Sequence, residues 1–307
     1  RAIQHRRCIL KMATNAGKTE VAAGIIKVID QKSLYVIHRK ELLHQTAARL
    51  QKRLGVKISK IGDGLFQTKR SIVVGMVQSL PKPIKANQDF YRQFKVLIVD
   101  ECAHQSANTW YKISMVCPAR WRFALSGTPF TGDDLKDLRL MSCIDSRIIM
   151  NVTNQELIDR GWSAKPTVHL WPAPHSENNW PYPQAINHMI VGNNDYNERI
   201  VQIVKSKWEE GVSTLVLVNR KAHGARLNQR MAGEKISCKF LRGELSSDYR
   251  NKALQDFREG RLGVVIATQI LDEGVDVPAI RCLILAAGGK SAIQLLQRVG
   301  RALRKKQ

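Results

Sequence analysis

Short apolar runs alternate with helical patterns along almost the whole sequence, and this alternation restricts the fold more than any other feature. The runs expected to be strands are residues 8–12, 33–37, 71–75, 96–99 and 122–125 in the first half, and 214–218, 236–240, 263–267 and 282–285 in the second. Helical patterns follow Lys18, Glu41, Lys221 and Ser247, and another begins at Ser291. Strands separated by helices predict an α/β fold of mainly parallel sheets flanked by helices.

The length of 307 residues is enough for two domains of ordinary size. The two halves share no obvious sequence repeat, but both follow the strand–helix pattern. We expect one domain at 1–163 and a second at 164–307, because the boundary falls between Gly161 and Pro166. The stretch 171–183 is rich in proline and aromatic residues, which predicts an irregular connection.

Four aromatic residues lie in or beside this connection: Trp162, Trp171, Trp180 and Tyr182. Aromatic faces can stack on nucleic-acid bases, so a strand-binding role is one interpretation. The other interpretation, which we favour, is that these rings anchor the connection onto the second domain.

The composition is globular and strongly basic. Apolar residues make up 44% and charged residues 24% of the sequence, which excludes a disordered chain. Lysine and arginine number 49 against 26 acidic residues, a net charge of +23. Enzymes of small metabolites seldom carry such an excess, so we expect nucleic acid as the partner rather than a merely basic surface.

The six cysteines contain no C-x-x-C pair, so we expect free thiols in a reducing intracellular compartment such as the cytoplasm, and no zinc site. No apolar run reaches membrane-spanning length and no signal peptide is visible, so no membrane association is expected. The first residue is Arg1 and a strand pattern begins almost at once. We therefore expect the chain to be the ordered part of a longer protein.

A phosphate-binding loop follows the first apolar run. The segment Ala13-Thr-Asn-Ala-Gly-Lys-Thr19 ends in the Gly-Lys-Thr of a P-loop, with Met12 where the usual first glycine stands. Backbone N–H groups between a strand and a helix cradle phosphates. The candidate nucleotide-binding residues are Thr14, Asn15, Ala16, Gly17, Lys18 and Thr19. Lys18 would neutralise phosphate charge and Thr19 would hold magnesium.

Two adjacent carboxylates follow the run 96–99, where the ligand sites of parallel sheets lie. Asp100 would hold magnesium through its water shell, and Glu101 would polarise the attacking water. A solvated pair of acids at a strand end is the alternative, but the P-loop upstream favours the catalytic interpretation.

A cluster of arginines lies at the other end of the chain, in Gln297-Arg-Val-Gly-Arg-Ala-Leu-Arg304. A nucleotide held by the P-loop and completed by this cluster would sit between two lobes. Hydrolysis could then open and close the lobes, which is the physical basis of a motor.

These features occur together in a known family: the chain resembles the superfamily 2 helicases over nearly its full length. Eight motifs follow in the family's order, namely the P-loop, 38–45, 77–80, 100–103, 125–129, 215–220, 267–278 and 297–304. Within the family it is most similar to the phage UvsW-like DNA branch-migration helicases, on 156–161 and 290–294. The resemblance implies two RecA-like domains with ATP and Mg²⁺ bound in a cleft between them.

The resemblance also implies roles for residues near the nucleotide. Arg301 and Arg304 match arginine-finger positions, and Gln297 would support them. The alternative is a basic helix that binds the phosphate backbone. Gly274 and Asp276 match the motif that contacts the nucleotide, with Asp276 at the ribose. Ser126 and Thr128 match the pair that couples hydrolysis to motion, or simply form a turn.

Family positions near the nucleic-acid backbone match Arg39, Gln78, Ser79, Arg220, Gly243 and Thr268. Such contacts hold the nucleic-acid strand by its phosphates and do not recognise its base sequence. Lys221 and His223, on the helix that follows Arg220, are expected to form a solvated face.

The sequence therefore predicts an ATP-hydrolysing DNA motor, monomeric, that unwinds or branch-migrates forked, junction or single-stranded DNA. Three alternatives stay open: a double-stranded DNA translocase that never separates strands, an RNA helicase, and a nucleic-acid-binding protein with a disabled ATPase. The last is disfavoured by the residues that are retained, namely Lys18, Thr19, Asp100, Glu101, Arg301 and Arg304.

Overall fold

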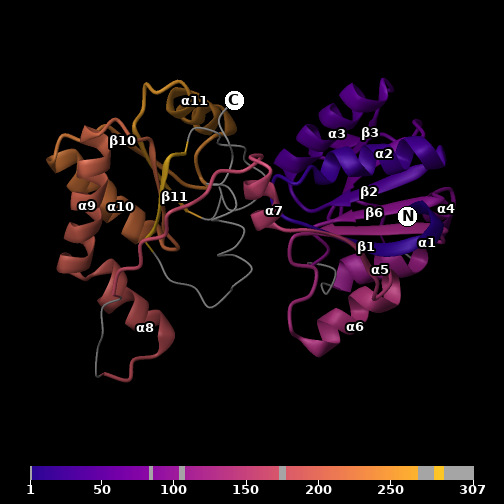
Figure 1. Cartoon of the computed structure of the whole chain (residues 1–307), viewed down its shortest axis with the longest axis horizontal. Coiled ribbons are helices and arrows are strands. Elements are labelled where there is room, and N and C mark those ends of the chain that lie inside the picture. The colour runs from indigo at the N-terminus through magenta and orange to yellow at the C-terminus, as the bar shows by residue number, and fades with distance from the viewer. Residues whose placement is uncertain (1, 83–85, 104–107, 173–177, 269–279, 287–307) are drawn as a thin grey trace. The chain divides into compact units, whose positions relative to one another are not determined.

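A computed structural model describes residues 2–82, 86–103, 108–172, 178–268 and 280–286. The chain divides into two compact units, Arg1–Arg160 (unit 1) and Gly161–Gln307 (unit 2). Each contains a sheet with helices beside it (Figure 1). The units separate after Arg160, whereas the expected domain boundary lies after residue 163.

Unit 1 is built on an eight-stranded sheet in the order β4-β3-β5-β2-β6-β7-β1-β8. The strands are β1 (Arg7–Met12), β2 (Ser33–Ile37), β3 (Ser59–Gly62), β4 (Leu65–Phe66), β5 (Ile72–Met76), β6 (Val96–Asp100), β7 (Trp121–Ser126) and β8 (Ile148–Val152). All neighbouring pairs are parallel except β3 and β4, which form an antiparallel hairpin at one edge. The parallel sheet predicted for the first half is therefore confirmed.

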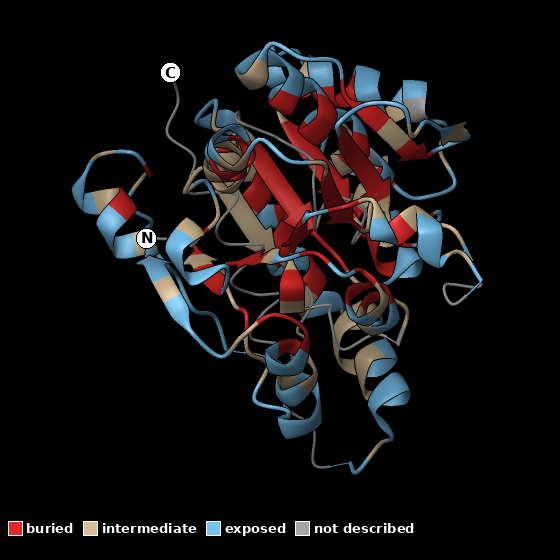
Figure 2. Ribbon diagram, turned by 90° about the vertical axis from the view of Figure 1, so that its right-hand side faces the viewer, coloured by how far each residue is buried: buried red, intermediate tan, exposed pale blue. Residues whose placement is uncertain are grey.

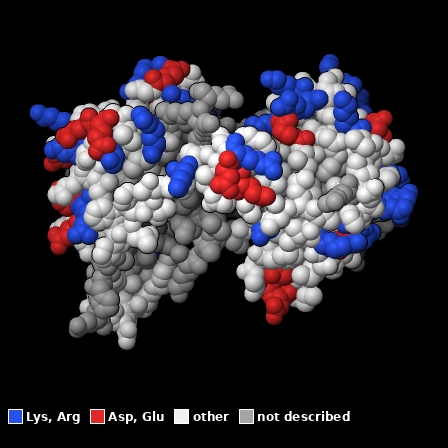
Figure 3. Space-filling model, viewed as in Figure 1, with Lys and Arg blue, Asp and Glu red and all other residues white. Residues whose placement is uncertain are grey.

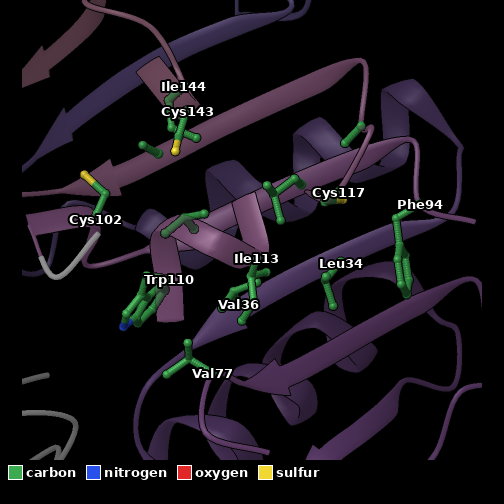
Figure 4. Packing of buried hydrophobic residues seen from close by; sticks show 14 of the residues in the cluster. Leu34, Val36, Val77, Phe94, Cys102, Trp110, Ile113, Cys117, Cys143 and Ile144 are labelled. Carbon is green, nitrogen blue, oxygen red and sulfur yellow. The ribbon is translucent and has the colours of Figure 1, made fainter. Parts of the chain in front are cut away.

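Helices cover both faces of this sheet, and the interior strands are buried (Figure 2). The helices are α1 (Ala2–His5), α2 (Lys18–Ile29), α3 (Lys40–Leu54), α4 (Gln88–Arg92), α5 (Asn108–Val116), α6 (Asp134–Cys143) and α7 (Asn154–Asp159). Apolar residues of α2 and α3 pack on one face. The other face packs against α5 and α6, where Trp110 and Ile113 meet Val36 and Val77 (Figure 4). Burial on both faces explains why the strands are almost uniformly apolar.

A buried arginine joins three elements beneath the second face. Arg122 on β7 is 6% exposed, and its guanidinium donates to four backbone carbonyls. These belong to Ser114 (2.7 Å), Cys117 (2.6 Å), Ala119 (3.1 Å) and Cys143 (2.9 Å). The carbonyls of Ser114, Cys117 and Cys143 lie at the C-terminal ends of α5 and α6, where helices leave acceptors unsatisfied, and that of Ala119 lies in the loop before β7. The positive charge is therefore compensated by helix termini.

The chain leaves unit 1 beside the P-loop strand. β8 pairs with β1, and the Ala13 N–H donates to the Val152 carbonyl over 2.9 Å. Thr153 then caps α7 in a reciprocal pair: its hydroxyl accepts from the Glu156 N–H, and its own N–H donates to Glu156 Oε2. The unit ends one residue after α7, at Arg160.

In the part of unit 2 that the structure describes, four strands form a parallel sheet in the order β10-β11-β9-β12. Its strands are β9 (Thr214–Leu217), β10 (Cys238–Leu241), β11 (Val264–Ala267) and β12 (Cys282–Leu285). Its helices are α8 (Tyr182–Ile186), η2 (Asn187–Val191), α9 (Asn194–Glu209), α10 (Lys221–Gly233) and α11 (Ser247–Arg258). Residues of α9 and α10 pack on one face of the sheet and those of α11 on the other.

The first turns of α9 and α10 are joined by a buried polar pair. His223 is 1% exposed, and its Nε2 lies 2.8 Å from Oδ1 of Asn197. The Asn197 amide donates to the carbonyls of Ile190, Val191 and Asn193, so its oxygen faces the imidazole as an acceptor. The expectation that His223 lies on a solvated face is wrong, because this polar pair satisfies the ring inside the core.

Helix α10 approaches β10 through a glycine. A Cβ at Gly224 would overlap the ring of Phe240, so the helix can lie this close only without a side chain there. Helix α2 contains the opposite case, Gly24, around which the neighbourhood is open.

Each strand predicted from the sequence is present, and the structure adds β3, β4 and β8. The helix expected from Ser291 lies outside the described residues. In the connection, Arg199 lies over the Trp171 ring at 5.7 Å and Trp180 stacks on His188 at 4.6 Å, whereas Trp162, Trp171 and Tyr182 are each more than half exposed. None of the helices in the described part of the chain combines the length and apolar character needed to cross a membrane.

Candidate nucleotide site and nucleic-acid edge

The P-loop connects β1 to α2 by a turn over residues 13–17. Two of its residues have positive φ, Asn15 at 71° and Gly17 at 79°. Gly17 is the N-cap of α2, so the amide groups of the first helical turn face the loop without intrahelical partners. Thr14, Asn15, Ala16 and Gly17 thus form the turn, and Lys18 and Thr19 begin the helix, as predicted from the sequence.

The acidic pair lies at the carboxyl end of β6. Asp100 is the last residue of the strand and is 7% exposed, whereas Glu101 follows with a φ of 51°. Positive φ is uncommon for a residue with a side chain, and such backbone strain concentrates at functional sites. The Lys18 ammonium forms an ion pair with Oε1 of Glu101. Residues 83 positions apart, both predicted from the sequence, are therefore in contact.

Burial and the close charges shift two pKa values in this group. Burial alone would lower the pKa of Lys18, but the carboxylates of Glu101 and Asp100 outweigh burial and raise it. Burial also raises the pKa of Asp100, although Lys18 opposes that shift. The two carboxylates therefore favour the cationic form of Lys18, whereas burial disfavours the charged form of Asp100 and a nearby cation favours it.

Tyr35 on β2 completes the group, and its role was not predicted from the sequence. It is 0% exposed and its hydroxyl donates to Oδ2 of Asp100 over 3.0 Å. In the sheet, Tyr35 is opposite Ile98, and Asp100 lies two residues further on the same face. Burial raises the pKa of Tyr35 well above its usual value, and Asp100 raises it further. One signal could have found it, because a tyrosine in a buried strand needs a partner for its hydroxyl.

The predicted coupling residues lie at the end of β7, beside the acidic pair. The Ser126 hydroxyl is 3.5 Å from Oε2 of Glu101, and the Thr128 N–H donates to Ser126 Oγ over 3.1 Å. Between them, a Cβ at Gly127 would lie 3.3 Å from the Met12 carbonyl oxygen. The turn after β7 therefore packs closely against the end of the P-loop strand.

Three predicted nucleic-acid residues of unit 1 follow the carboxyl ends of two adjacent strands. Arg39 follows β2 as the N-cap of α3, while Gln78 and Ser79 follow β5. The Gln78 amide donates to the His38 carbonyl over 2.9 Å, and the Val77 N–H donates to Ile37. The structure therefore brings these residues together at the sheet edge that also carries the P-loop.

The three candidates of unit 2 are arranged in the same way. Arg220 follows β9 as the N-cap of α10, Gly243 follows β10 and Thr268 follows β11. The Thr268 N–H donates to the Leu241 carbonyl over 3.3 Å. Arg220 has the same extended conformation as Arg39, so the two units present an arginine at the same point of a strand–helix turn.

The remaining predicted site residues lie outside the described residues. They are Gln297, Arg301 and Arg304 of the arginine cluster, and Gly274 and Asp276 of the motif before it. Their assignment stays a prediction from the sequence.

Cations and acids stand side by side on the surface of both units. On the face in Figure 3, Lys and Arg are interspersed with Asp and Glu over unit 1 and over unit 2. Ion pairs such as Lys205–Glu234 and Arg230–Glu198 account for part of that mixing.

Known families match both units. Residues 1–131 match the family described as "Type III restriction enzyme, res subunit", and residues 195–306 match "Helicase conserved C-terminal domain". The chain belongs to the superfamily 2 helicases.

Curated relatives of this superfamily 2 helicase align along almost its whole length. It is 24% identical to the putative ATP-dependent helicase IRC3 of Saccharomyces cerevisiae over 97% of the chain and 46% of IRC3. It is 25% identical to the DNA 3'-5' translocase XPB2 of Sulfurisphaera tokodaii, over 99% of the chain and 76% of XPB2. It is 24% identical to the ATP-dependent DNA helicase uvsW of phage T4, over 98% of the chain and 63% of uvsW. The chain thus spans about half to three quarters of these relatives.

A solved structure confirms the fold. A fragment of a putative HsdR subunit of a type I restriction enzyme from Vibrio vulnificus superposes with a TM-score of 0.72, at 18% identity, over 98% of this chain and 57% of that one. Together with the family matches, this likeness confirms the RecA-like α/β fold expected for this superfamily 2 helicase.

Proposed function

We propose that the chain is the motor of an ATP-dependent DNA helicase or translocase. The main support is a cluster of side chains in unit 1. Lys18, Asp100, Glu101 and Ser126 lie together at the carboxyl ends of the strands. An ammonium, two carboxylates and a helix N-terminus are the groups that phosphoryl transfer needs for positioning and charge stabilisation. The names of IRC3, XPB2 and uvsW support ATP use and DNA as the track.

The residues present fit a nucleotide with magnesium. Asn15 and Gly17 hold the loop backbone at positive φ, the conformation in which successive amides form an anion cradle. Thr19 and Asp100 would hold Mg²⁺, which neutralises charge that develops on the phosphates. Lys18 would bind a terminal phosphate, and Glu101 would orient the attacking water. Arg301 and Arg304, with Gln297, would complete the site, and Gly274 and Asp276 would contact the nucleotide.

The track would run along the carboxyl edges of both sheets. Arg39, Gln78 and Ser79 in unit 1, and Arg220, Gly243 and Thr268 in unit 2, would contact its phosphates. The net charge of +23 supports a polyanionic partner. We propose forked, junction or single-stranded DNA as the substrate and a monomer as the active form. We also propose that the chain forms two domains, 1–163 and 164–307, and that the protein works in a reducing compartment.

A turnover assay tests the proposal. The parent should hydrolyse ATP faster with DNA present, and Lys18→Ala should abolish that activity. Equal turnover in parent and variant would show a disabled ATPase and overturn the proposal. Stimulation by single-stranded, duplex, forked and four-way DNA, and by RNA of matched length, identifies the track.

Two further assays separate the modes of action. Strand displacement on a fork reports unwinding, whereas displacement of a triplex-forming strand also reports movement along intact duplex. Triplex displacement without strand displacement would identify a double-stranded DNA translocase.

A further inference from the structure

The Tyr35 hydroxyl is bonded to one of the side chains proposed to hold magnesium. It donates to Oδ2 of Asp100 over 3.0 Å. Asp100 is the last residue of β6, and Tyr35 lies on the neighbouring strand β2. One buried hydroxyl therefore links two adjacent strands of the sheet at this carboxylate.

Both oxygens of Asp100 are held by separate donors. Oδ2 accepts from Tyr35, and Oδ1 accepts from the Glu101 N–H over 3.0 Å. A carboxylate fixed in this way does not need to reorient when a cation binds, and outer partners of this kind commonly decide metal affinity.

The hydroxyl is the only part of Tyr35 that the core does not need. The ring packs among apolar residues between the sheet and the helices α2 and α3. A phenylalanine would fill the same space, so core packing alone does not explain the oxygen atom.

We infer that Tyr35 is a positioning residue for magnesium, whose hydroxyl orients the Asp100 carboxylate toward the metal. The inference rests on the proposed function, because it adds a support to the same site. The hydroxyl is buried and bonded to Asp100, so its effect on the metal passes through that carboxylate.

The test is Tyr35→Phe, read by equilibrium binding of a fluorescent ATP analogue at increasing free Mg²⁺. The variant should need about tenfold more Mg²⁺ for half-maximal tightening of binding. Its affinity for the analogue in excess EDTA should stay within about twofold of the parent, because the cradle and Lys18 are unchanged. Hydrolysis should return toward the parental rate at saturating Mg²⁺.

Tyr91→Phe is the matched control. Tyr91 is also 0% exposed and donates its hydroxyl, to the Pro81 carbonyl over 3.1 Å, but it packs on the opposite face of the sheet. It should lower stability comparably and leave the Mg²⁺ dependence unchanged. Tyr35→Met, which also lacks the hydroxyl, replaces Tyr35→Phe if that variant does not fold.

A double variant excludes a general structural effect. On an Asp100→Asn background the carboxylate is already lost, so adding Tyr35→Phe should not move the Mg²⁺ midpoint further. A midpoint for Tyr35→Phe within twofold of the parent, or an equal loss of affinity in EDTA, would overturn the inference while the proposed function stands. A parent that binds no nucleotide with Mg²⁺ would overturn both.

Discussion

The Lys18 ammonium and the Glu101 carboxylate form an ion pair that joins the first residue of α2 to the end of β6. The two side chains are 16% and 20% exposed. Under the proposed function the same ammonium binds a phosphate, so an incoming nucleotide competes with Glu101 for Lys18. The acid proposed to activate water is therefore held by the lysine in this structure.

Glu101→Gln should separate binding from hydrolysis. The amide cannot activate water, so turnover should fall by about 100-fold or more. Nucleotide affinity should be equal or tighter, because the neutral amide competes less for Lys18. Glu20→Gln, in the first turn of α2, is the control and should keep parental turnover. Tenfold weaker nucleotide binding by Glu101→Gln would contradict the competition.

Arg122→Ala should destabilise unit 1 by about 3 kcal/mol, because four buried carbonyls lose their donor. Arg120→Ala is the control: this neighbour is exposed over Trp121, and the change should stay within about 0.5 kcal/mol. Urea unfolding followed by circular dichroism measures both. Equal stabilities would show that the helix ends do not depend on the guanidinium.

The stability of unit 2 should fall below neutral pH because of His223. Burial lowers the pKa of His223 from 6.5 to about 4 in the folded chain. Between pH 4 and 6.5 the unfolded chain binds more protons than the folded chain. The contribution of neutral His223 to the free energy of unfolding is therefore complete above about pH 6.5, and about 3 kcal/mol of it is lost as the pH falls toward about 4. Urea unfolding from pH 7.5 to 4.5 measures the slope. His223→Gln should flatten it, whereas His5→Gln, at an exposed position, should not.

Two glycine-to-alanine changes in helices should change the free energy of unfolding in opposite directions. Gly24→Ala in α2 faces open space and should stabilise by about 0.5–1 kcal/mol through helix propensity. Gly224→Ala in α10 places a methyl group against the Phe240 ring. It should destabilise unit 2 by about 1–3 kcal/mol, even though alanine has the higher helix propensity here too. Adding Phe240→Leu should recover part of the loss. Thermal unfolding of the three variants checks the signs.

DNA affinity should fall steeply with salt, since phosphate contacts release counterions. Arg39→Ala and Arg220→Ala should each make the slope of log affinity against log salt shallower by about 1. Arg92→Ala is the control, because this residue pairs with Asp89 on α4. Fluorescence anisotropy with labelled DNA measures the slopes, and an affinity insensitive to salt would contradict a backbone-tracking surface.

The interior strands could be predicted from sequence because burial on both faces makes them continuous apolar runs, as in 33–37 and 96–99. The three strands that were missed lie toward the edges of unit 1. β8 has exposed and half-buried residues throughout, β3 contains a lysine and a glycine, and β4 has two residues. Such short or half-exposed segments cannot be told from loops by composition.

The site could be predicted where a residue belongs to a recognisable motif, as Lys18 does in the P-loop and Glu101 does in the acidic pair after a buried strand. Tyr35 belongs to no such motif: a tyrosine in a buried strand signals that its hydroxyl needs a partner, but nothing in the strand's own pattern identifies that partner as Asp100. His223 was misjudged for a related reason, since the asparagine that satisfies it lies on another helix. A local sequence pattern does not identify a hydrogen-bond partner that lies on a distant helix or strand, because that pairing arises only when the chain packs.

The edge strand β8 has a mechanical consequence. Its last residue, Val152, accepts a hydrogen bond from Ala13, and the path out of unit 1 runs from there through α7 to Arg160. Any tension along that path loads the base of the P-loop before it reaches the rest of the sheet. The phosphate cradle and the tether to the second half of the chain thus share one anchor point.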